Sequence, residues 1–133
     1  MSSIFTKIIN KEIPAYIVYE DANFIAFLDV FPLAKGHTLV VPKIEVDKLF
    51  DLDKETYSGL MAVSYKIAQA IEKSIPCLRV GMSVVGLEIP HAHVHLVPLN
   101  RMEDISFTSP RQKFTQEEFQ HMATEIKNNL GNL

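Results

Sequence analysis

Residues 90–98 read PHAHVHLVP, and the rest of the chain is best interpreted outward from this stretch. Side chains alternate between the two faces of a β-strand, so residues i, i+2 and i+4 point the same way. On a strand, His91, His93 and His95 would form one row, with about 6.6 Å between successive Cα atoms. Burying an imidazole costs free energy unless it finds a hydrogen-bond partner, so folding alone does not explain the pattern. It predicts a functional site on a strand over 90–98.

A row of histidines suits two kinds of chemistry. Histidines at i and i+2 can reach a shared ion, and His37 could complete such a site, which makes a metal-binding protein one option. A neutral imidazole can instead attack phosphorus and hold a covalent phosphoryl or nucleotidyl group. It attacks through one ring nitrogen while the other nitrogen is held as a hydrogen-bond donor. His93 is the predicted nucleophile because it alone has a histidine on each side.

The composition is that of one globular domain, residues 1–133. Of these residues 47% are apolar and 22% charged, which is ordinary for a globular protein. A net charge of −3 gives no electrostatic footprint for nucleic acid or for an anionic membrane, and no apolar run is long enough to span a bilayer. The N-terminus lacks the apolar region of a signal peptide, and Cys77 is the only cysteine. We therefore expect a cytoplasmic protein without an internal disulfide.

Periodicity along the chain predicts an α+β fold. Helical spacing predicts a short helix over about 4–10, capped by Ser3, and a long helix over about 54–74, capped by Asp53. A capping box that begins at Thr115 predicts a last helix. Runs of β-branched and aromatic residues predict strands over 16–20, 24–29, 37–42, 79–85 and 90–98. The expected fold is a five-stranded, mainly antiparallel sheet with one long packing helix and short N- and C-terminal helices. The apolar strand over 37–42 is expected to be central.

Residues 91–97, HAHVHLV, resemble the signature of the histidine triad (HIT) family of nucleotide hydrolases and transferases, in which His-x-His-x-His precedes two apolar residues. Residues 4–14 are similar to the opening of the family, and residues 29–43 to its central stretch. The resemblance covers a core of about 4–99 and leaves 100–133 as a C-terminal loop and helix. It is nearest to the nucleoside phosphoramidase-like branch of the family.

The resemblance implies hydrolysis of a purine nucleoside 5′-phosphoramidate, or a related nucleotide, through a covalent nucleotidyl group on His93. His91 and His95 would orient the nucleophile and bind phosphate oxygens, and His37 would support the triad. Asp29 would accept hydrogen bonds from the ribose hydroxyls, a role that its charge suits independently, although an aspartate here could also cap a turn. An apolar slot for the purine would be lined by Ile4, Phe5, Ile8, Ile13 and Phe27.

The stretch before the triad departs from the family pattern. Leu87 stands where a glutamine is usual, and leucine cannot donate to a phosphate oxygen, so Ser83 or a backbone N–H would have to supply that contact. Glu88 falls where some relatives place a serine that helps to protonate the leaving group. A carboxylic acid with a raised pKa could do the same, or Glu88 is a surface residue. A dinucleoside polyphosphate hydrolase and a non-catalytic nucleotide-binding module, acting as a sensor or partner protein, remain alternatives.

The resemblance also bears on metals and partners. Some bacterial relatives bind a structural zinc through two cysteines and a histidine, and the matching positions here are Ser3, Thr6 and Glu45. Only Glu45 is an ordinary zinc ligand, so this structural zinc is not expected. The mechanism that the resemblance implies does not strictly require a metal, so no cofactor is expected either. The implied partner is a second copy of the chain, in a homodimer that joins two sheets through residues 54–74 and 80–85. No nucleic-acid or membrane partner is expected.

Overall fold

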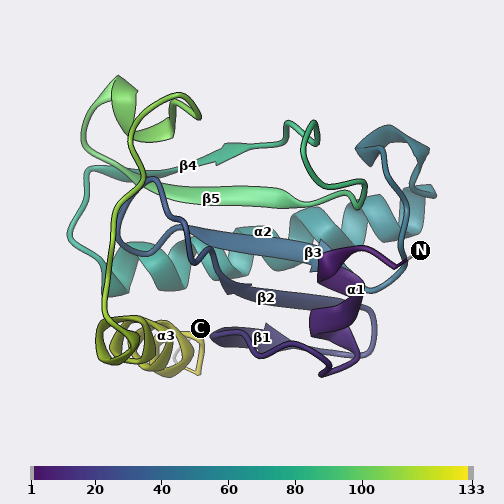
Figure 1. The fold of residues 1–133 in the computed structure, drawn as a ribbon, viewed down its shortest axis with the longest axis horizontal. Helices are drawn as coiled ribbons and strands as arrows, with labels where there is room; N and C mark the ends of the chain where they lie inside the picture. The colour runs from purple at the N-terminus through teal and green to yellow at the C-terminus, as the bar shows by residue number, and fades with distance from the viewer. Residues whose placement is uncertain (1, 132–133) are drawn as a thin grey trace.

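The computed structural model describes residues 2–131 and confirms the five-stranded antiparallel sheet (Figure 1). The strand order is β1-β2-β3-β5-β4, and every neighbouring pair is antiparallel. β3 is central, as its apolar sequence predicts. The strands are β1 (Ile17–Glu20), β2 (Phe24–Leu28), β3 (Thr38–Pro42), β4 (Arg79–Ser83) and β5 (Val94–Leu99).

Three α-helices begin at the predicted caps. The side chain of Ser3 accepts from the Thr6 N–H ahead of α1 (Ile4–Ile9), and the side chain of Asp53 accepts from the Thr56 N–H ahead of α2 (Lys54–Ser74). Thr115 closes a capping box at the start of α3 (Gln116–Leu130). Two 3₁₀ turns, η1 (Leu49–Asp51) and η2 (Met102–Ile105), complete the elements, and η2 lies in a segment predicted as loop. Within residues 2–131, none of these helices is both long and apolar enough to cross a bilayer.

Helices cover both faces of the sheet. α2 and α3 lie on one side, and α1 crosses β2 and β3 on the other (Figure 1). Phe5 and Ile8 hold α1 against the sheet, and burial of each such side chain contributes about 1.5–3 kcal/mol. Because both faces are covered, every residue of β2 and β3 is buried. The α1 side meets Ile25, Phe27, Leu39 and Val41; the α2 and α3 side meets Ala26, Leu28, Val40, Val94 and Leu96.

The predicted strand over 90–98 is wrong at its beginning. β5 starts at Val94, so His95 lies on the strand, whereas His91 and His93 lie in the loop before it. The N–H of His91 donates to the carbonyl of Ile89 at 2.8 Å, which closes a tight turn at the intervening proline. In addition, β3 ends at Pro42, which has no N–H with which to continue the ladder. The three histidines are therefore not one row on a strand face.

Candidate functional site

Four of the five histidines gather on the side of the sheet that α1 covers. His95 lies on β5, His37 directly precedes β3, and His91 and His93 come from the loop before β5. All four are buried, with no more than 7% of any residue exposed. The ring centroids of His93 and His95 are 4.8 Å apart, and those of His37 and His95 are 5.2 Å apart. The structure thus brings together the histidines that the sequence singles out.

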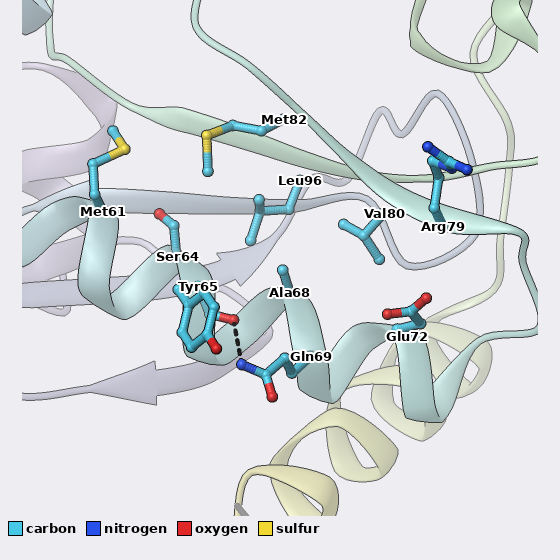
Figure 2. A pocket seen from close by; sticks show the side chains of 10 residues that line it. All are labelled: Met61, Ser64, Tyr65, Ala68, Gln69, Glu72, Arg79, Val80, Met82 and Leu96. Carbon is cyan, nitrogen blue, oxygen red and sulfur yellow. Dashed lines mark hydrogen bonds between the residues drawn. The ribbon is translucent and has the colours of Figure 1, made fainter.

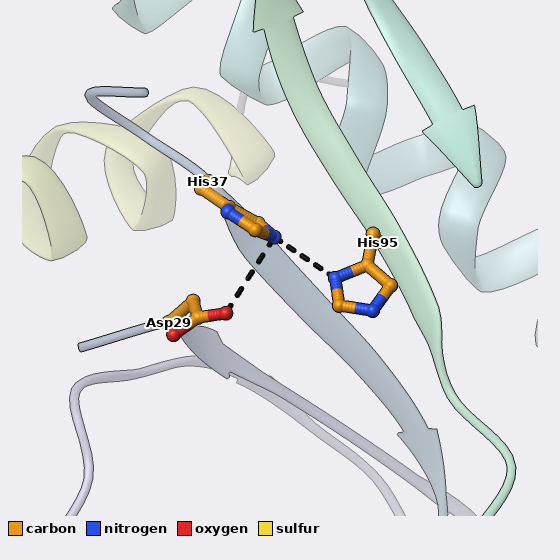
Figure 3. Close-up of side chains that lie close together, drawn as sticks. All are labelled: Asp29, His37 and His95. Carbon is orange, nitrogen blue, oxygen red and sulfur yellow. Dashed lines mark hydrogen bonds and ion pairs between the residues drawn. The ribbon is translucent and has the colours of Figure 1, made fainter. Parts of the chain in front are cut away.

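The proton positions of His37 and His95 follow from one backbone amide. The N–H of Leu33 donates to Nδ1 of His37 at 3.0 Å, so this nitrogen carries no proton. A neutral His37 then holds its proton on Nε2 and donates it to Nδ1 of His95 at 2.9 Å (Figure 3). His95 is left with its own proton on Nε2. The pair therefore presents an N–H donor on the outer nitrogen of His95.

Both imidazoles of this pair stay neutral near pH 7. Burial lowers the pKa of His37 to about 3, and the nearby charge that His95 would carry adds to the effect. Burial also lowers the pKa of His95 to about 4, helped by His93. A neutral pair is what the hydrogen bond between the two rings requires, because two imidazolium ions would face each other with donors only.

His93 has the hydrogen bond that a nucleophilic imidazole needs. Its Nδ1 lies 2.7 Å from the carbonyl oxygen of His91 and donates to it, since a carbonyl can only accept. In the neutral ring Nε2 then carries the lone pair, and among residues 2–131 no hydrogen bond reaches that nitrogen. Burial lowers the pKa of His93, which favours this neutral state. The Phe5 ring packs edge-on against the His93 imidazole, with 4.9 Å between the ring centroids, and so restricts the orientation of the imidazole plane.

The two carboxylate oxygens of Asp29 have different surroundings. Oδ1 accepts from the Phe31 N–H at 2.8 Å, so the turn-capping alternative is correct for this oxygen. Oδ2 lies 3.6 Å from Nε2 of His37, too far for a hydrogen bond (Figure 3). Burial raises the pKa of Asp29, against the opposing effect of the Phe31 N–H. A second hydrogen-bond donor can thus reach Oδ2 without breaking the turn.

Asp29, His37 and His95 also lie close enough together to hold a metal ion, since one ligand atom from each falls within 4.8 Å of the others. The hydrogen bonds disfavour this use. A metal on Nε2 of His37 would move the proton of that ring to Nδ1, where it would face the N–H of Leu33. Two donors would then oppose each other in a buried place, so the arrangement is suited to proton ordering rather than to metal binding.

The residues predicted to line a purine slot are not equally accessible. Phe5 and Ile8, on the inner side of α1, and Phe27, on β2, are buried between this helix and the sheet, so they can form only the floor of such a slot. Ile13 is partly buried, and Ile4 is 48% exposed. Of the five predicted residues, only Ile4 and Ile13 are accessible to a ligand.

The stretch before the triad forms an irregular loop. Ser83 ends β4 directly opposite His95 in the register of the sheet, which places it beside the histidines. Burial is the main cause of the raised pKa of Asp29 and of the lowered pKa of His93; the negative charge of exposed Glu88 adds to the first shift and opposes the second. Leu87 is 89% exposed, so it does not serve the core in place of the glutamine. Ser83 thus faces His95 across the sheet, and Glu88 acts on the site through its charge.

The C-terminal segment adds two residues that the sequence did not indicate. The Phe107 ring packs edge-on against His95 with 4.7 Å between centroids. Arg111 donates from Nη1 to the carbonyl of Phe31 at 2.8 Å and lies over the Phe107 ring. Its charge acts on Asp29, His37 and His95. Nothing in the polar stretch over 100–113 signals these contacts.

The three positions that match a zinc site in some relatives lie together, but they do not suit zinc. Ser3 and Thr6 offer neutral hydroxyls, which are not among the ordinary zinc ligands. Their hydroxyls are already engaged, since Thr6 donates to Glu45 at 2.6 Å and Ser3 lies 2.7 Å from Nδ1 of His91. The donor set therefore fits a hydrogen-bonded cluster.

A groove of about 400 Å³ runs between α2 and β4, on the other face of the sheet from the histidines (Figure 2). Tyr65 and Met82 line it and are 72% and 48% exposed. Ser64 also lines it, and its buried hydroxyl has no hydrogen-bond partner within residues 2–131. The groove involves residues from 54–74 and 80–85, the ranges for which the family resemblance implies homodimer contacts.

Comparison with known proteins agrees with this geometry. A family model described as HIT domain matches residues 10–102. The adenosine 5′-monophosphoramidase of Schizosaccharomyces pombe is 30% identical over 98% of the chain and 99% of its own length. A Hit-like protein from Bartonella henselae superposes with a TM-score of 0.84, at 34% identity and 96% coverage of both chains. A zinc-bound histidine triad protein from Mycobacterium smegmatis gives a TM-score of 0.85 at 30% identity, over 99% of this chain and 95% of its own.

Proposed function

Because the chain belongs to the HIT domain family, we propose that it hydrolyses purine nucleoside 5′-phosphoramidates, or related nucleotides, at the α-phosphorus. The relative named adenosine 5′-monophosphoramidase, which aligns over nearly the whole chain, supports this substrate class. The observation that carries the proposal is the 2.7 Å hydrogen bond from Nδ1 of His93 to the His91 carbonyl. It leaves the lone pair of Nε2 free for attack.

The reaction proceeds in two displacements. Nε2 of His93 attacks the α-phosphorus, the bond from phosphorus to the leaving nitrogen breaks, and that nitrogen takes up a proton and departs as an amine or ammonia. Water then attacks the same phosphorus, the bond to Nε2 breaks, and the water gives up a proton as the nucleoside monophosphate leaves. No redox step and no metal-bound intermediate is needed. His93 returns to its neutral state after each cycle.

The surrounding residues take the roles that their positions allow. The Nε2–H of His95 donates to a phosphate oxygen, which stabilises the charge that develops during each displacement. His37 keeps that proton in place, and His91 holds Nδ1 of the nucleophile through its carbonyl. Asp29 binds the ribose hydroxyls with Oδ2. Ser83 supplies a phosphate contact from the end of β4, and the exposed, negatively charged Glu88 acts electrostatically on His93.

The test is brief incubation with adenosine 5′-phosphoramidate, followed by acid quenching and intact-mass measurement. We expect the wild type to gain one adenylyl group and to release AMP, and His93→Ala to do neither. His121→Ala is the matched control, because His121 is an exposed histidine on α3, and it should behave as wild type. Parallel incubation with a diadenosine polyphosphate tests the alternative hydrolase. Binding of AMP without adduct or turnover would overturn the enzyme and favour a nucleotide-binding module.

The proposed partner is a second copy of the chain, seated on the groove between α2 and β4. Exposed Tyr65 and Met82, together with the unpaired hydroxyl of Ser64 among the described residues, support this face as the contact. Sedimentation should give twice the 15.0 kDa of the single chain. Met82→Glu should give the monomer, whereas Met102→Glu, at a methionine that is 86% exposed on η2, should not. A monomeric wild type would refute the dimer.

A further inference from the structure

His91 and His93 lie in an irregular loop, so the ladder of the sheet does not hold them. The proposed chemistry nevertheless requires the nucleophile to be fixed within a fraction of an ångström. The N–H of His91 closes a turn within the loop by donating to the carbonyl of Ile89 at 2.8 Å, and the N–H of Ala92 ties the loop to the segment after β3 by donating to the carbonyl of Val46 at 2.7 Å. The other supports come from side chains, and they lead away from the histidines to the beginning of the chain.

The ring of His91 is held from both sides. Its Nε2 lies 2.8 Å from the carbonyl oxygen of Pro42, so Nε2 carries the proton and donates it. Nδ1 must then accept, and the hydroxyl of Ser3 donates to it at 2.7 Å. The Ser3 oxygen in turn accepts from the N–H of Thr6 at 3.1 Å. Ser3 thus caps α1 and fixes the tautomer of His91 with one hydroxyl.

Glu45 ties this arrangement to the loop that follows β3. Its Oε1 accepts from the N–H of Ser3 at 2.7 Å and from the hydroxyl of Thr6 at 2.6 Å. The Ser3 bond is the main reason that the pKa of Glu45 lies below its usual range. The adjacent residue, Val46, holds Ala92 between the two loop histidines. Residues 45 and 46 therefore attach both the start of α1 and the histidine loop to one short segment.

We propose that Ser3, Thr6 and Glu45 form a hydrogen-bonded clamp that positions His91 and, through the His91 carbonyl, the nucleophile His93. The proposal rests on the function proposed above, since His93 must be the nucleophile for its position to affect the rate. None of the three clamp residues contacts the reacting atoms, so they are positioning residues. Their hydrogen bonds cross-link the start of α1, the segment after β3 and the ring of His91.

Two pairs of variants test the clamp. Ser3→Ala removes the donor to His91, and Ser2→Ala makes the same chemical change at the exposed neighbouring serine outside the clamp. Glu45→Ala removes the acceptor of two hydrogen bonds, while Glu45→Gln retains an oxygen that can accept both. Because Glu45 is exposed, this second pair tests the clamp even if Ser3→Ala fails to fold.

The first readout is long-range ¹H–¹⁵N NMR of the imidazoles, which reports the protonated nitrogen of each ring without any substrate. In the wild type we expect the proton of His91 on Nε2 and that of His93 on Nδ1. Ser3→Ala and Glu45→Ala should give averaged, exchange-broadened signals for His91, whereas Ser2→Ala and Glu45→Gln should keep the wild-type pattern. This readout stands even if the wild type turns over no phosphoramidate, so failure of the proposed function is recognised separately.

The second readout is the split between kcat and KM for adenosine 5′-phosphoramidate. Loss of one positioning hydrogen bond should lower kcat by about threefold to tenfold and leave KM nearly unchanged, because the clamp does not touch the nucleotide. Glu45→Gln should restore kcat. If Ser3→Ala and Glu45→Ala fold with wild-type imidazole spectra and wild-type kcat, the clamp serves stability alone and the proposal is overturned.

Discussion

The buried pair of His37 and His95 makes the stability of the fold depend on pH in a defined direction. In the folded chain the pKa of His37 is about 3 and that of His95 about 4, whereas an unfolded chain has histidines of pKa about 6.5. Below pH 6.5 the unfolded state therefore binds protons that the folded state does not. The free energy of unfolding should fall as the pH is lowered from that point, until the folded-state values are reached.

The size of the effect follows from the linkage relation. Each such histidine lowers the free energy of unfolding by about 1.4 kcal/mol per pH unit once the pH lies well below 6.5, which gives about 2 kcal/mol between about pH 7.5 and about pH 5. The two rings share a hydrogen bond and titrate as a pair, so we expect about 2–4 kcal/mol from this pair. Burial also lowers the pKa of His93, which therefore contributes in the same direction. Carboxylates such as Glu20 and Asp21 have lowered pKa values and titrate below this window.

Urea unfolding at constant ionic strength, repeated from about pH 7.5 to about pH 5, measures the dependence directly. His37→Gln should be less stable at neutral pH. Its free energy of unfolding should depend less steeply on pH, because the unfolded variant takes up one proton fewer. His121→Gln, which changes an exposed histidine, should keep the wild-type slope. A wild-type free energy that stays flat over this range would show that the folded pair takes up protons freely, and the proton arrangement deduced for the site would then be wrong.

Three further predictions concern single positions. Gly36→Ala should lower the free energy of unfolding in urea by about 1–3 kcal/mol, because φ is +90° and a new Cβ would lie 2.8 Å from a buried isoleucine side chain. Gly131→Ala, at a glycine with ordinary helical geometry, should leave it unchanged. Phe107→Ala should admit water to His95 and raise its pKa from about 4 toward the ordinary value in an NMR titration, and an unchanged pKa would contradict the shielding by this ring. Leu87→Gln adds a donor at an exposed position and should raise kcat/KM by about threefold to tenfold; an unchanged kcat/KM would mean that the phosphate contact is already made elsewhere.

Local patterns predicted the helices and most strands. The bounds of α2 were predicted closely because Asp53 and the apolar stripe are both local signals. The loop conformation of His91 and His93 was not predicted, because their alternation with apolar residues is also typical of a strand. It depends on Pro42 and Val46, which are distant in the sequence. Non-local partners of this kind leave no trace in periodicity.

The candidate site shows the same division. The sequence identified the four histidines and Asp29 by residue type, and the structure brings them together. Sequence-based prediction missed Phe107, which packs on His95 and lies outside the stretch of about 4–99 that resembles the family. It also missed the amide of Leu33 and the carbonyl of His91, since backbone groups are common to every residue.

The amide of Leu33 fixes the proton positions of two imidazoles, and this determines which substitutions at position 33 are tolerated. Every amino acid except proline supplies the same N–H. Any other residue at position 33 that fills the same buried volume therefore preserves the proton arrangement. A comparison of sequences would register only a preference for an aliphatic residue of the right size. A proline at this position, by contrast, would remove the donor and let the His37 ring invert. An inactive protein could thus arise with every chemically recognisable residue still in place.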